Sequence, residues 1–350
     1  MMFWKRFIGV FTARNLEFLR DKESLSWNLV FPLVLVAAFA FLFDSDDRTI
    51  VSVGVVHELA QEVAQEQVDN DHTIRVPEFA SLSFVEQVPY TNREQALRRL
   101  QQHQLDLVIA PAEQRYWLNE SSPGSALAAE LLTARSDAYT QEILTGQALR
   151  YVDWVLPGIL AMNLMFSCLY GVGYVIVRYR KNSVLKRLQA TPLSAFEFLL
   201  AQVASRVWLV IVTLIVVYLI CNAIFSFVME GSYLLLILLA FLGSLCISAL
   251  GLLIAARTRS EELSRGLLDF VAWPMLLLSG VWFSLDSSPV WVQQFAQIFP
   301  LTHLLAAARA VMFDGAGLVE ILPQIMILLA MTLAFLLLGA RLFRWIGDGR

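Results

Sequence analysis

The sequence predicts an α-helical polytopic membrane protein with six transmembrane helices and an α+β extracytoplasmic domain inserted between the first and second of them. Apolar residues make up 57% of its 350 residues, charged residues only 16%, and the mean hydropathy is +0.61. A soluble domain is far more polar than this. Six stretches reach the roughly 20 apolar residues that a spanning helix needs. Lys and Arg are also divided unequally among the segments that connect these stretches.

Residues 1–23 are predicted to form a cytoplasmic amphipathic N-terminal helix ahead of transmembrane helix 1, residues 24–43. Apolar and basic side chains recur there at helical spacing (Phe3, Phe7, Val10, Phe11, Arg14 and Phe18), which is typical of a helix lying along a membrane surface. Ala38-Phe39-Ala40 resembles a cleavage site, so a cleaved signal peptide is the alternative. The amphipathic segment before the apolar run favours a retained transmembrane helix.

Residues 44–153 are predicted to form the α+β domain outside the membrane, and they carry 18 acidic and 8 basic side chains. Runs rich in β-branched or alternating apolar residues predict strands at 49–56, 82–88 and 105–110. A capping box, Thr91 to Glu94, predicts a helix that continues to His103. From Ser125 a helical pattern predicts a stalk helix that leads into transmembrane helix 2.

The remaining transmembrane helices are predicted at 154–177, within 207–283 (207–228, 233–256 and 267–283), and at 321–340 inside residues 318–350, which end in a short cytoplasmic tail. With both termini in the cytoplasm, the inner segments hold 17 of the 26 basic residues and 7 acidic ones, and the outer segments hold 9 basic and 22 acidic residues. Cytoplasmic loops retain Lys and Arg, so this orientation is expected.

Motifs for chemistry on the chain itself are missing from the sequence. It has no G-x-x-x-x-G-K-[ST] and no G-x-S-x-G, and its four histidines are far apart, so we expect no catalytic residue, metal or cofactor on this chain. Its three cysteines lie in predicted transmembrane helices. Basic residues are scattered along membrane edges, next to lipid, which makes nucleic acid an unexpected partner. Asp269, near the start of the fifth transmembrane helix, is either an interfacial carboxylate or a proton relay.

The loop at 178–206 contains a short helix with an apolar and a basic side. Ser183 is expected to cap this helix, residues 184–189, and Thr191-Pro192 to end it, because Pro disfavours helical geometry in the residue before it. Ser194 and Glu197 form a capping box for the helix that follows. The apolar side of the short helix must lie either on lipid or against another protein.

Three blocks carry a family resemblance: "LPGIL" at 156–160, "RKNSVLKRLQATPLSAFEFLLAQV" at 180–203, and "LLLSGVWFSLDSSPVWVQQFAQIFPLTHLLAAARAVM" at 276–312. In this order they resemble the permease subunits of type-2 ABC exporters, of the kind with a large extracytoplasmic domain between the first two spans. The resemblance implies a coupling helix at 178–206 that seats in a separate ABC ATPase subunit, present in two copies and holding ATP and Mg. It assigns to coupling Val184, Leu185, Lys186, Arg187, Leu188, Thr191 and Pro192.

The same resemblance implies a second permease chain, identical or paralogous, with the substrate pathway between the second and fifth transmembrane helices of opposing subunits. Expected pathway residues are Met162, Phe166, Tyr170, Trp273 and Phe283. Residues 284–317 resemble the extracytoplasmic re-entrant region of the exit side, where Asp286, Trp291, Pro300 and His303 lie. For all of these residues, ordinary packing, capping or interfacial anchoring is the alternative.

The implied function is ATP-driven export of an amphipathic or hydrophobic substrate, such as a drug or lipid, across the bacterial cytoplasmic (inner) membrane. The large outer domain resembles those of exporters that use a periplasmic adaptor protein. Two other classes stay open. One is a membrane sensor or scaffold whose outer domain binds a ligand or envelope partner, and the other is a proton-coupled carrier that depends on Asp269.

Overall fold

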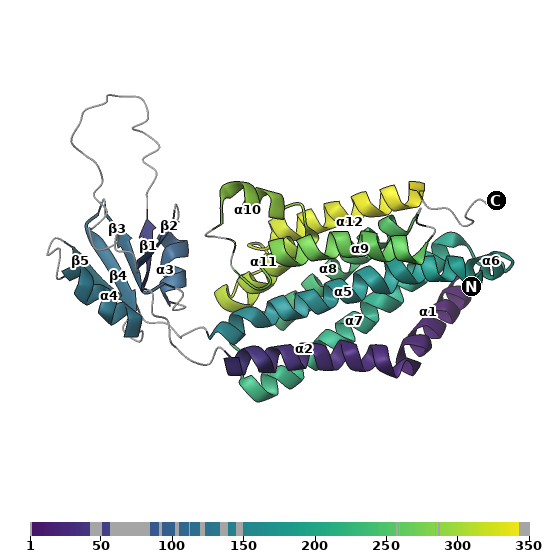
Figure 1. Ribbon diagram of the computed structural model, residues 1–350, viewed down its shortest axis with the longest axis horizontal. Helices are drawn as coiled ribbons and strands as arrows, with labels where there is room; N and C mark the ends of the chain where they lie inside the picture. Colours follow the sequence, from purple (N-terminus) through teal and green to yellow (C-terminus); the bar gives the residue numbers. More distant parts are fainter. Residues whose placement is uncertain are drawn as a thin grey trace, which may run out of the picture. The chain divides into compact units, whose positions relative to one another are not determined.

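The computed structural model describes residues 2–42, 51–56, 85–90, 93–101, 105–111, 113–119, 123–133, 139–144, 150–256, 258, 260–283, 285 and 288–342. The chain forms two compact units, one of Met1–Leu42 with Tyr151–Arg350 and one of Phe43–Arg150 (Figure 1). The first unit is a helical bundle. The second is built around a β-sheet.

The bundle consists of long helices joined by short turns. In chain order they are α1 (Met2–Arg20), α2 (Lys22–Leu42), α5 (Tyr151–Lys181), α6 (Val184–Gln189), α7 (Ala195–Phe225), α8 (Tyr233–Ala255), α9 (Glu261–Leu278), α10 (Val290–Ala296), α11 (Pro300–Asp314) and α12 (Leu322–Leu342). Four of them, α5, α7, α8 and α12, are each long and apolar enough to cross a membrane. The count rises to as many as six if each of two bent pairs is one span, α1 with α2 at 61° and α10 with α11 at 98°.

The chain is therefore a polytopic helical membrane protein, and the number of six transmembrane spans stays a prediction. Helix α9, the predicted fifth span, is not among the four apolar helices, because its 18 residues include Glu261, Glu262, Arg265 and Asp269. Its more C-terminal half is apolar. The boundaries of α5, α7, α8 and α12 each contain most of a predicted span.

Helix α5 packs closely against α8 through small residues. A Cβ on Gly251 of α8 would lie 2.8 Å from the carbonyl oxygen of Leu169, and one on Gly173 of α5 would lie 3.0 Å from the carbonyl oxygen of Gly251. Ser244, Ser248, Gly251 and Ala255 are all buried in α8. Small residues on one helix face let two backbones approach, which is how helices associate in lipid.

The second unit has a five-stranded sheet in the order β2-β1-β3-β4-β5. Its elements are β1 (Val51–Val56), β2 (Val85–Tyr90), α3 (Arg93–Gln101), β3 (Leu107–Ala110), β4 (Arg115–Asn119), α4 (Pro123–Thr133) and β5 (Thr140–Leu144). Strand β1 runs parallel to β2 and β3, β4 is antiparallel to β3, and β5 is parallel to β4. The two helices cover opposite faces. Leu107 and Ile109 pack with α4, and Val108 and Ala110 pack with α3. All four residues of β3 are therefore buried.

The predicted stalk helix differs from the structure. Helix α4 ends at Thr133, and residues 140–144 form β5, which pairs with β4 from Arg115–Thr140 to Asn119–Leu144. Residues 140–144 form backbone hydrogen bonds with β4, and this pairing outweighs the helical spacing of the apolar residues beyond Thr133. The Thr91 capping box cannot be compared, because Thr91 lies outside the described residues.

Candidate functional site

The loop between α5 and α7 holds α6 with one side fixed and the other free. Leu185 is only 1% exposed, and Val184 and Leu188 are half-buried. Lys186 and Arg187 are exposed on the other side, and Thr191 and Pro192 are exposed in the turn that follows. The predicted apolar and basic sides are thus confirmed. Leu185 points into the bundle, where it anchors α6, and the basic side chains are the ones that a partner could reach.

Ser183 occupies the expected N-cap position of α6, but its side chain does not cap the helix. Ser183 has φ 56°, in the left-handed region, and its side chain makes no capping hydrogen bond. The reason is that α5 continues to Lys181, so Ser183 takes part in the turn that ends α5. Its backbone N–H donates to the Arg180 carbonyl at 3.3 Å.

The start of α7 is fixed both by its own cap and by α1. The predicted capping box is confirmed, since Glu197 N donates to Ser194 Oγ at 3.2 Å and Ser194 N donates to Glu197 Oε2 at 2.7 Å. Arg6 of α1 donates to the Pro192 carbonyl at 2.5 Å and lies 3.7 Å from Glu197. Helix α1 therefore holds the turn after α6 in place, a role for Arg6 that its sequence position does not reveal.

Arg180 connects the same loop to the end of α8. Its guanidinium donates to the carbonyls of Ala255 at 3.0 Å, Thr258 at 2.6 Å and Ala256 at 3.4 Å. The last carbonyls of a helix lack partners within the helix, so a cation there satisfies them. In the sequence Arg180 counted only toward membrane orientation. Its actual partners lie about 75 residues further along the chain.

Helix α1 packs on the bundle through part of the stripe predicted to face lipid. Arg14 donates to the Gly171 carbonyl at 3.3 Å and to Tyr179 Oη at 3.1 Å, and the side chain of Ser205 donates to Asn15 at 2.9 Å. Burial opposes ionisation of Glu17, but hydrogen bonds from Tyr179 and Arg14 and the Arg14 charge outweigh it and hold the pKa of Glu17 below its usual value. The apolar side chains left exposed on α1 are Phe3, Trp4, Ile8, Leu16 and Leu19.

Three of the expected pathway residues meet on one face of α5 and α9. The rings of Phe166 and Tyr170 lie 6.0 Å apart, and those of Phe166 and Trp273 lie 6.5 Å apart, edge to face. The Tyr170 hydroxyl donates a hydrogen bond to Asp269. Met162 lies apart from them, buried in the core. Phe283 lies beyond the end of α9 and is 74% exposed.

Helices α10 and α11 form the hairpin of the expected exit region. Pro300 is the first residue of α11 and is buried, and His303 is buried with its Nε2 hydrogen-bonded to the Gln297 carbonyl at 2.8 Å. These two residues shape the hairpin. Trp291 is exposed on α10, and Asp286 lies outside the described residues. Thr302, which the sequence did not single out, donates to the Ala296 carbonyl at 2.7 Å and shares a hydrogen bond with Ser279 Oγ at 3.0 Å.

Two of the blocks that carry the resemblance meet in space. Gly158 of "LPGIL" lies under the Val281 backbone, since a Cβ on Gly158 would be 2.5 Å from the Val281 carbonyl oxygen. Gly280 ends α9 with φ +73°, a conformation that side chains disfavour. Tyr151 donates to the Trp282 carbonyl at 3.0 Å. The start of α5 and the end of α9 are thereby joined at the same level of the bundle.

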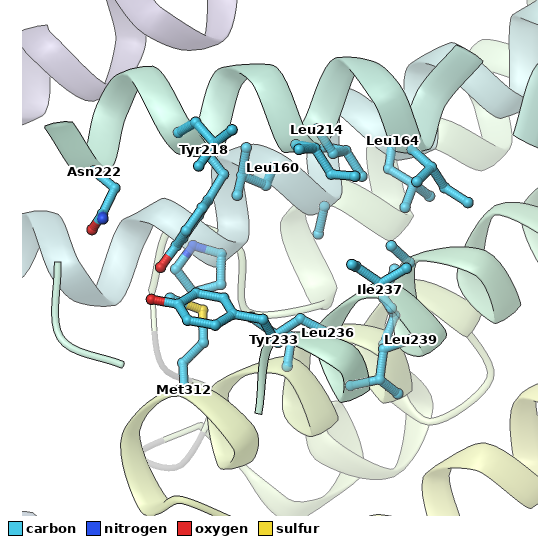
Figure 2. A pocket seen from close by; sticks show the side chains of 18 residues that line it. Leu160, Leu164, Leu214, Tyr218, Asn222, Tyr233, Leu236, Ile237, Leu239 and Met312 are labelled. Carbon is cyan, nitrogen blue, oxygen red and sulfur yellow. The ribbon is translucent and has the colours of Figure 1, made fainter. Parts of the chain in front are cut away.

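A chamber of about 350 Å³ opens among α5, α7, α8 and α11. Figure 2 shows its apolar wall, with Leu160 and Leu164 from α5, Leu214 from α7 and Leu236, Ile237 and Leu239 from α8. Tyr218 and Tyr233 lie at one end with their hydroxyls converging, and Asn222 lines the same end (Figure 2). Within the described residues no cluster of His, Cys, Asp and Glu side chains is arranged for a metal ion.

The bundle of apolar helices, its exposed amphipathic loop helix and its bent helical hairpin define a polytopic membrane permease. The chain belongs to the ABC-2 family of transporter proteins, whose model matches residues 22–341.

Individual relatives agree with this membership. The chain is 21% identical to the probable multidrug ABC transporter permease YbhS of Escherichia coli over 367 residues, 95% of each protein. It is 26% identical to the inner membrane transport permease YhhJ of Escherichia coli over 190 residues, 53% of this chain and 51% of YhhJ. This alignment spans only about half of YhhJ. ABC transporter G family member 20 of Dictyostelium discoideum is 30% identical over 176 residues, 48% of this chain and 23% of that protein.

Proposed function

We propose that this chain is the transmembrane subunit of an ATP-driven exporter of the bacterial inner membrane. It moves an amphipathic or hydrophobic substrate outward, contributes no ATP site of its own, and works with two copies of a separate ATPase subunit and with a second permease chain. The names of its relatives, an inner membrane transport permease and a probable multidrug ABC transporter permease, support this assignment.

The observation that carries the proposal is the build of the α6 loop. Its apolar anchor, Leu185, is buried, while Lys186 and Arg187 are exposed. Arg6 ties the following turn to α1, and Arg180 ties the preceding helix to α8. A loop that only returned the chain would need no such bracing. A braced helix with free cations can instead transmit a push from a docked ATPase to several membrane helices at once.

The proposed topology places six spans in the membrane, with both termini and the α6 loop in the cytoplasm. The sheet unit, 43–150, lies outside the membrane, where it is available to a periplasmic adaptor. The α10–α11 hairpin re-enters from the outer side. The unequal distribution of Lys and Arg supports this orientation.

Substrate moves, in this proposal, along the face of α5 and α9 that carries Phe166, Tyr170 and Trp273. The large apolar residues exposed on α9 are Leu263, Leu267, Phe270, Trp273 and Leu277. Glu262 and Arg265 are exposed beside them at the start of the helix. The apolar part of this face suits an apolar molecule or a second permease chain, and large exposed apolar patches commonly mark such surfaces.

The test is a charge reversal on α6. Arg187→Glu combined with Leu188→Glu should stop ATP-dependent transport of a fluorescent amphipathic dye into inverted membrane vesicles, while the ATPase subunit still hydrolyses ATP. In such vesicles the cytoplasmic face is outside, so export appears as uptake. Lys22→Glu, at the exposed first residue of α2, is the control and should export normally. Normal export by the double variant would contradict docking through α6.

Partner identification separates the exporter from the sensor or scaffold. Purification in mild detergent followed by mass spectrometry should recover a stoichiometric subunit with a P-loop. A sensor needs no such partner, so recovery of this chain alone, with nucleotide and crosslinker present, would favour the sensor.

A further inference from the structure

The chamber among α5, α7, α8 and α11 is lined by one stripe from each helix. Its lining includes Leu160 and Leu164 on α5, Leu214 on α7, Leu236 and Leu239 on α8, and Met312 on α11. Within each helix the spacing is mainly three or four residues, so each helix turns one face inward. Ala161, Ala240 and Ala308 leave room that larger side chains would fill.

The chamber opens sideways between α7 and α8. Ile215, Leu219 and Ile237 line it and are also 39%, 59% and 40% exposed. Both helices are apolar enough to cross a membrane. An opening between two such helices, framed by exposed aliphatic side chains, faces the hydrocarbon of the bilayer. What enters it must come from the lipid phase.

The interior favours an apolar occupant over water or empty space. Protein interiors are close-packed, so a void of about 350 Å³ is unusual. Apolar cavities do not hold water, because a buried water molecule needs polar partners. The volume is instead at the lower end of pockets that bind small ligands.

The one polar end of the chamber is rich in hydrogen-bond donors. The Tyr218 and Tyr233 rings meet edge to face with centroids 5.9 Å apart, and their hydroxyls converge (Figure 2). Each phenol carries one O–H donor, and among the described residues the buried Tyr218 Oη has no hydrogen-bond partner. Asn222 Oδ1 already accepts from Phe227 N at 3.0 Å. Its N–H groups remain available at this end, and the fitting ligand atom is an acceptor such as an ester carbonyl.

The position of this polar end matches the chemistry of a phospholipid. Tyr233 is the first residue of α8, and its ring meets that of Tyr218, which lies seven residues before the end of α7 at Phe225. The start of α8 is where that helix enters the apolar layer, so the tyrosine pair lies toward the edge of this layer, on the side where a bilayer has its ester groups. The aliphatic wall of Leu164, Leu214 and Leu239 extends from there toward the bundle interior.

We propose that the chamber is a binding site for one acyl chain of a diacyl phospholipid, whose ester carbonyl accepts a hydrogen bond from the Tyr218–Tyr233 pair. The site is separate from the α5–α9 face, and it goes beyond the proposed export function. A bound chain fills the gap between α7 and the rest of the bundle and enters from the bilayer through the α7–α8 opening.

The first experiment labels the site. The permease with its ATPase subunit is placed in bilayer discs of phosphatidylethanolamine and phosphatidylglycerol that contain phosphatidylethanolamine with a photoreactive group midway along one acyl chain. Labelled peptides should come from 211–222 and 233–240. Ala240→Phe fills the chamber and should reduce this labelling to background. Leu238→Phe, on the same helix and outside the chamber lining, should label like the wild type. Equal labelling of the two variants would overturn the proposal.

The second experiment tests the hydrogen bond between the lipid ester carbonyl and the Tyr218–Tyr233 pair. Tyr233→Phe should lower labelling about fivefold, the equilibrium equivalent of roughly one net hydrogen bond, while Thr213→Val on α7, which removes a hydroxyl outside the lining, should change nothing. An ether-linked probe lacks the carbonyl. The ether probe should label the wild-type protein as weakly as the ester probe labels Tyr233→Phe. Its labelling yield should be the same in Tyr233→Phe as in the wild type. Identical labelling by ester and ether probes would overturn the carbonyl contact, and displacement of the lipid by the exported dye would overturn the lipid as occupant.

Discussion

Helices α5 and α7 have the same length, 31 residues, and both can cross a membrane, yet they stand in opposite environments. Within their most apolar stretches, 72% of the α5 residues are buried inside the protein, against 28% for α7. Helix α7 is nevertheless the more apolar of the two. In a membrane, apolar character marks contact with lipid, and the helix at the centre of the bundle can be the less apolar one.

The composition of α5 explains its central place. Gly158, Gly171 and Gly173 allow close approach of Val281, Arg206 and Gly251, respectively. Asn163 Nδ2 donates to the Asn28 carbonyl at 3.1 Å, so a polar side chain on α5 bonds to the neighbouring helix α2. Helix α7 instead exposes Val212, Ile215, Val216, Leu219, Ile220 and Ile224. Small and polar residues make contacts between helices, and large aliphatic residues meet lipid.

The largest difference between α5 and α7 is expected in the free energy of unfolding when an isoleucine on each helix is replaced by alanine. Ile159 on α5 is fully buried, and Ile224 on α7 is 67% exposed. Ile159→Ala should lower the free energy of unfolding by about 2–5 kcal/mol, since it removes packed atoms and leaves a cavity. Ile224→Ala, its matched control, should change it by less than about 0.5 kcal/mol. Denaturant unfolding in detergent micelles measures both. Equal losses would contradict the division between buried α5 and lipid-facing α7.

A smaller effect is expected where α8 meets α5. Gly251→Ala places a methyl group 2.8 Å from the Leu169 carbonyl oxygen, so the helices must separate, and the cost should be about 1–3 kcal/mol. Gly339 of α12 also faces α8, but its nearest neighbour would be 3.7 Å from the added methyl group. Gly339→Ala should be neutral or slightly stabilising, because Ala is the better helix former. A melting temperature lowered equally by both would show that the α5–α8 approach is not special.

Local and compositional features could be predicted from the sequence. Apolar runs indicated α5, α7, α8 and α12, and the Ser194–Glu197 capping box needs only residues three apart. The Ser183 side chain makes no cap because α5 continues about one turn beyond the apolar run, to Lys181. The stalk helix beyond Thr133 failed because β4 offers residues 140–144 a pairing partner. Both misses come from long-range structure that overrides a local pattern.

The candidate site divides in the same way. The amphipathic α6 followed from the spacing of its residues. The family resemblance placed Phe166, Tyr170 and Trp273 between opposing subunits, and their contact within one chain is the ordinary helix packing that was the alternative. The roles of Arg6 and Arg180 could not be predicted, because each donates to a backbone carbonyl far along the chain, and a carbonyl leaves no mark in a sequence. The apolar chamber was equally out of reach, since its wall combines stripes from four helices, each of which reads as ordinary packing.

The bracing of the α6 loop gives the next prediction. Arg180→Ala removes the donors that bond to the carbonyls of Ala255, Ala256 and Thr258 and should cost about 1.5 kcal/mol, the scale of a hydrogen bond to a charged group. Arg178→Ala, two residues earlier at an exposed position, should cost almost nothing. Thermal unfolding measures the stability, and the ratio of dye exported to ATP hydrolysed measures coupling. An unchanged ratio in Arg180→Ala would contradict its role in transmitting motion.

The smallest effect is expected at the carboxylate of the α5–α9 face. In Asp269→Asn the Tyr170 hydroxyl can still donate to the side-chain oxygen, so the contact between the helices is kept and only the charge is lost. An ATP-driven exporter should then retain dye export within about fivefold, the scale on which charged and neutral hydrogen bonds differ. A proton-coupled carrier would lose export altogether, because Asn cannot exchange a proton. The decisive measurement is export by Asp269→Asn vesicles supplied with ATP and a protonophore. Continued export by this variant excludes a proton-driven mechanism. If Asp269→Asn loses export while Tyr170→Phe keeps it, the coupling that we have assigned to α6 belongs to Asp269.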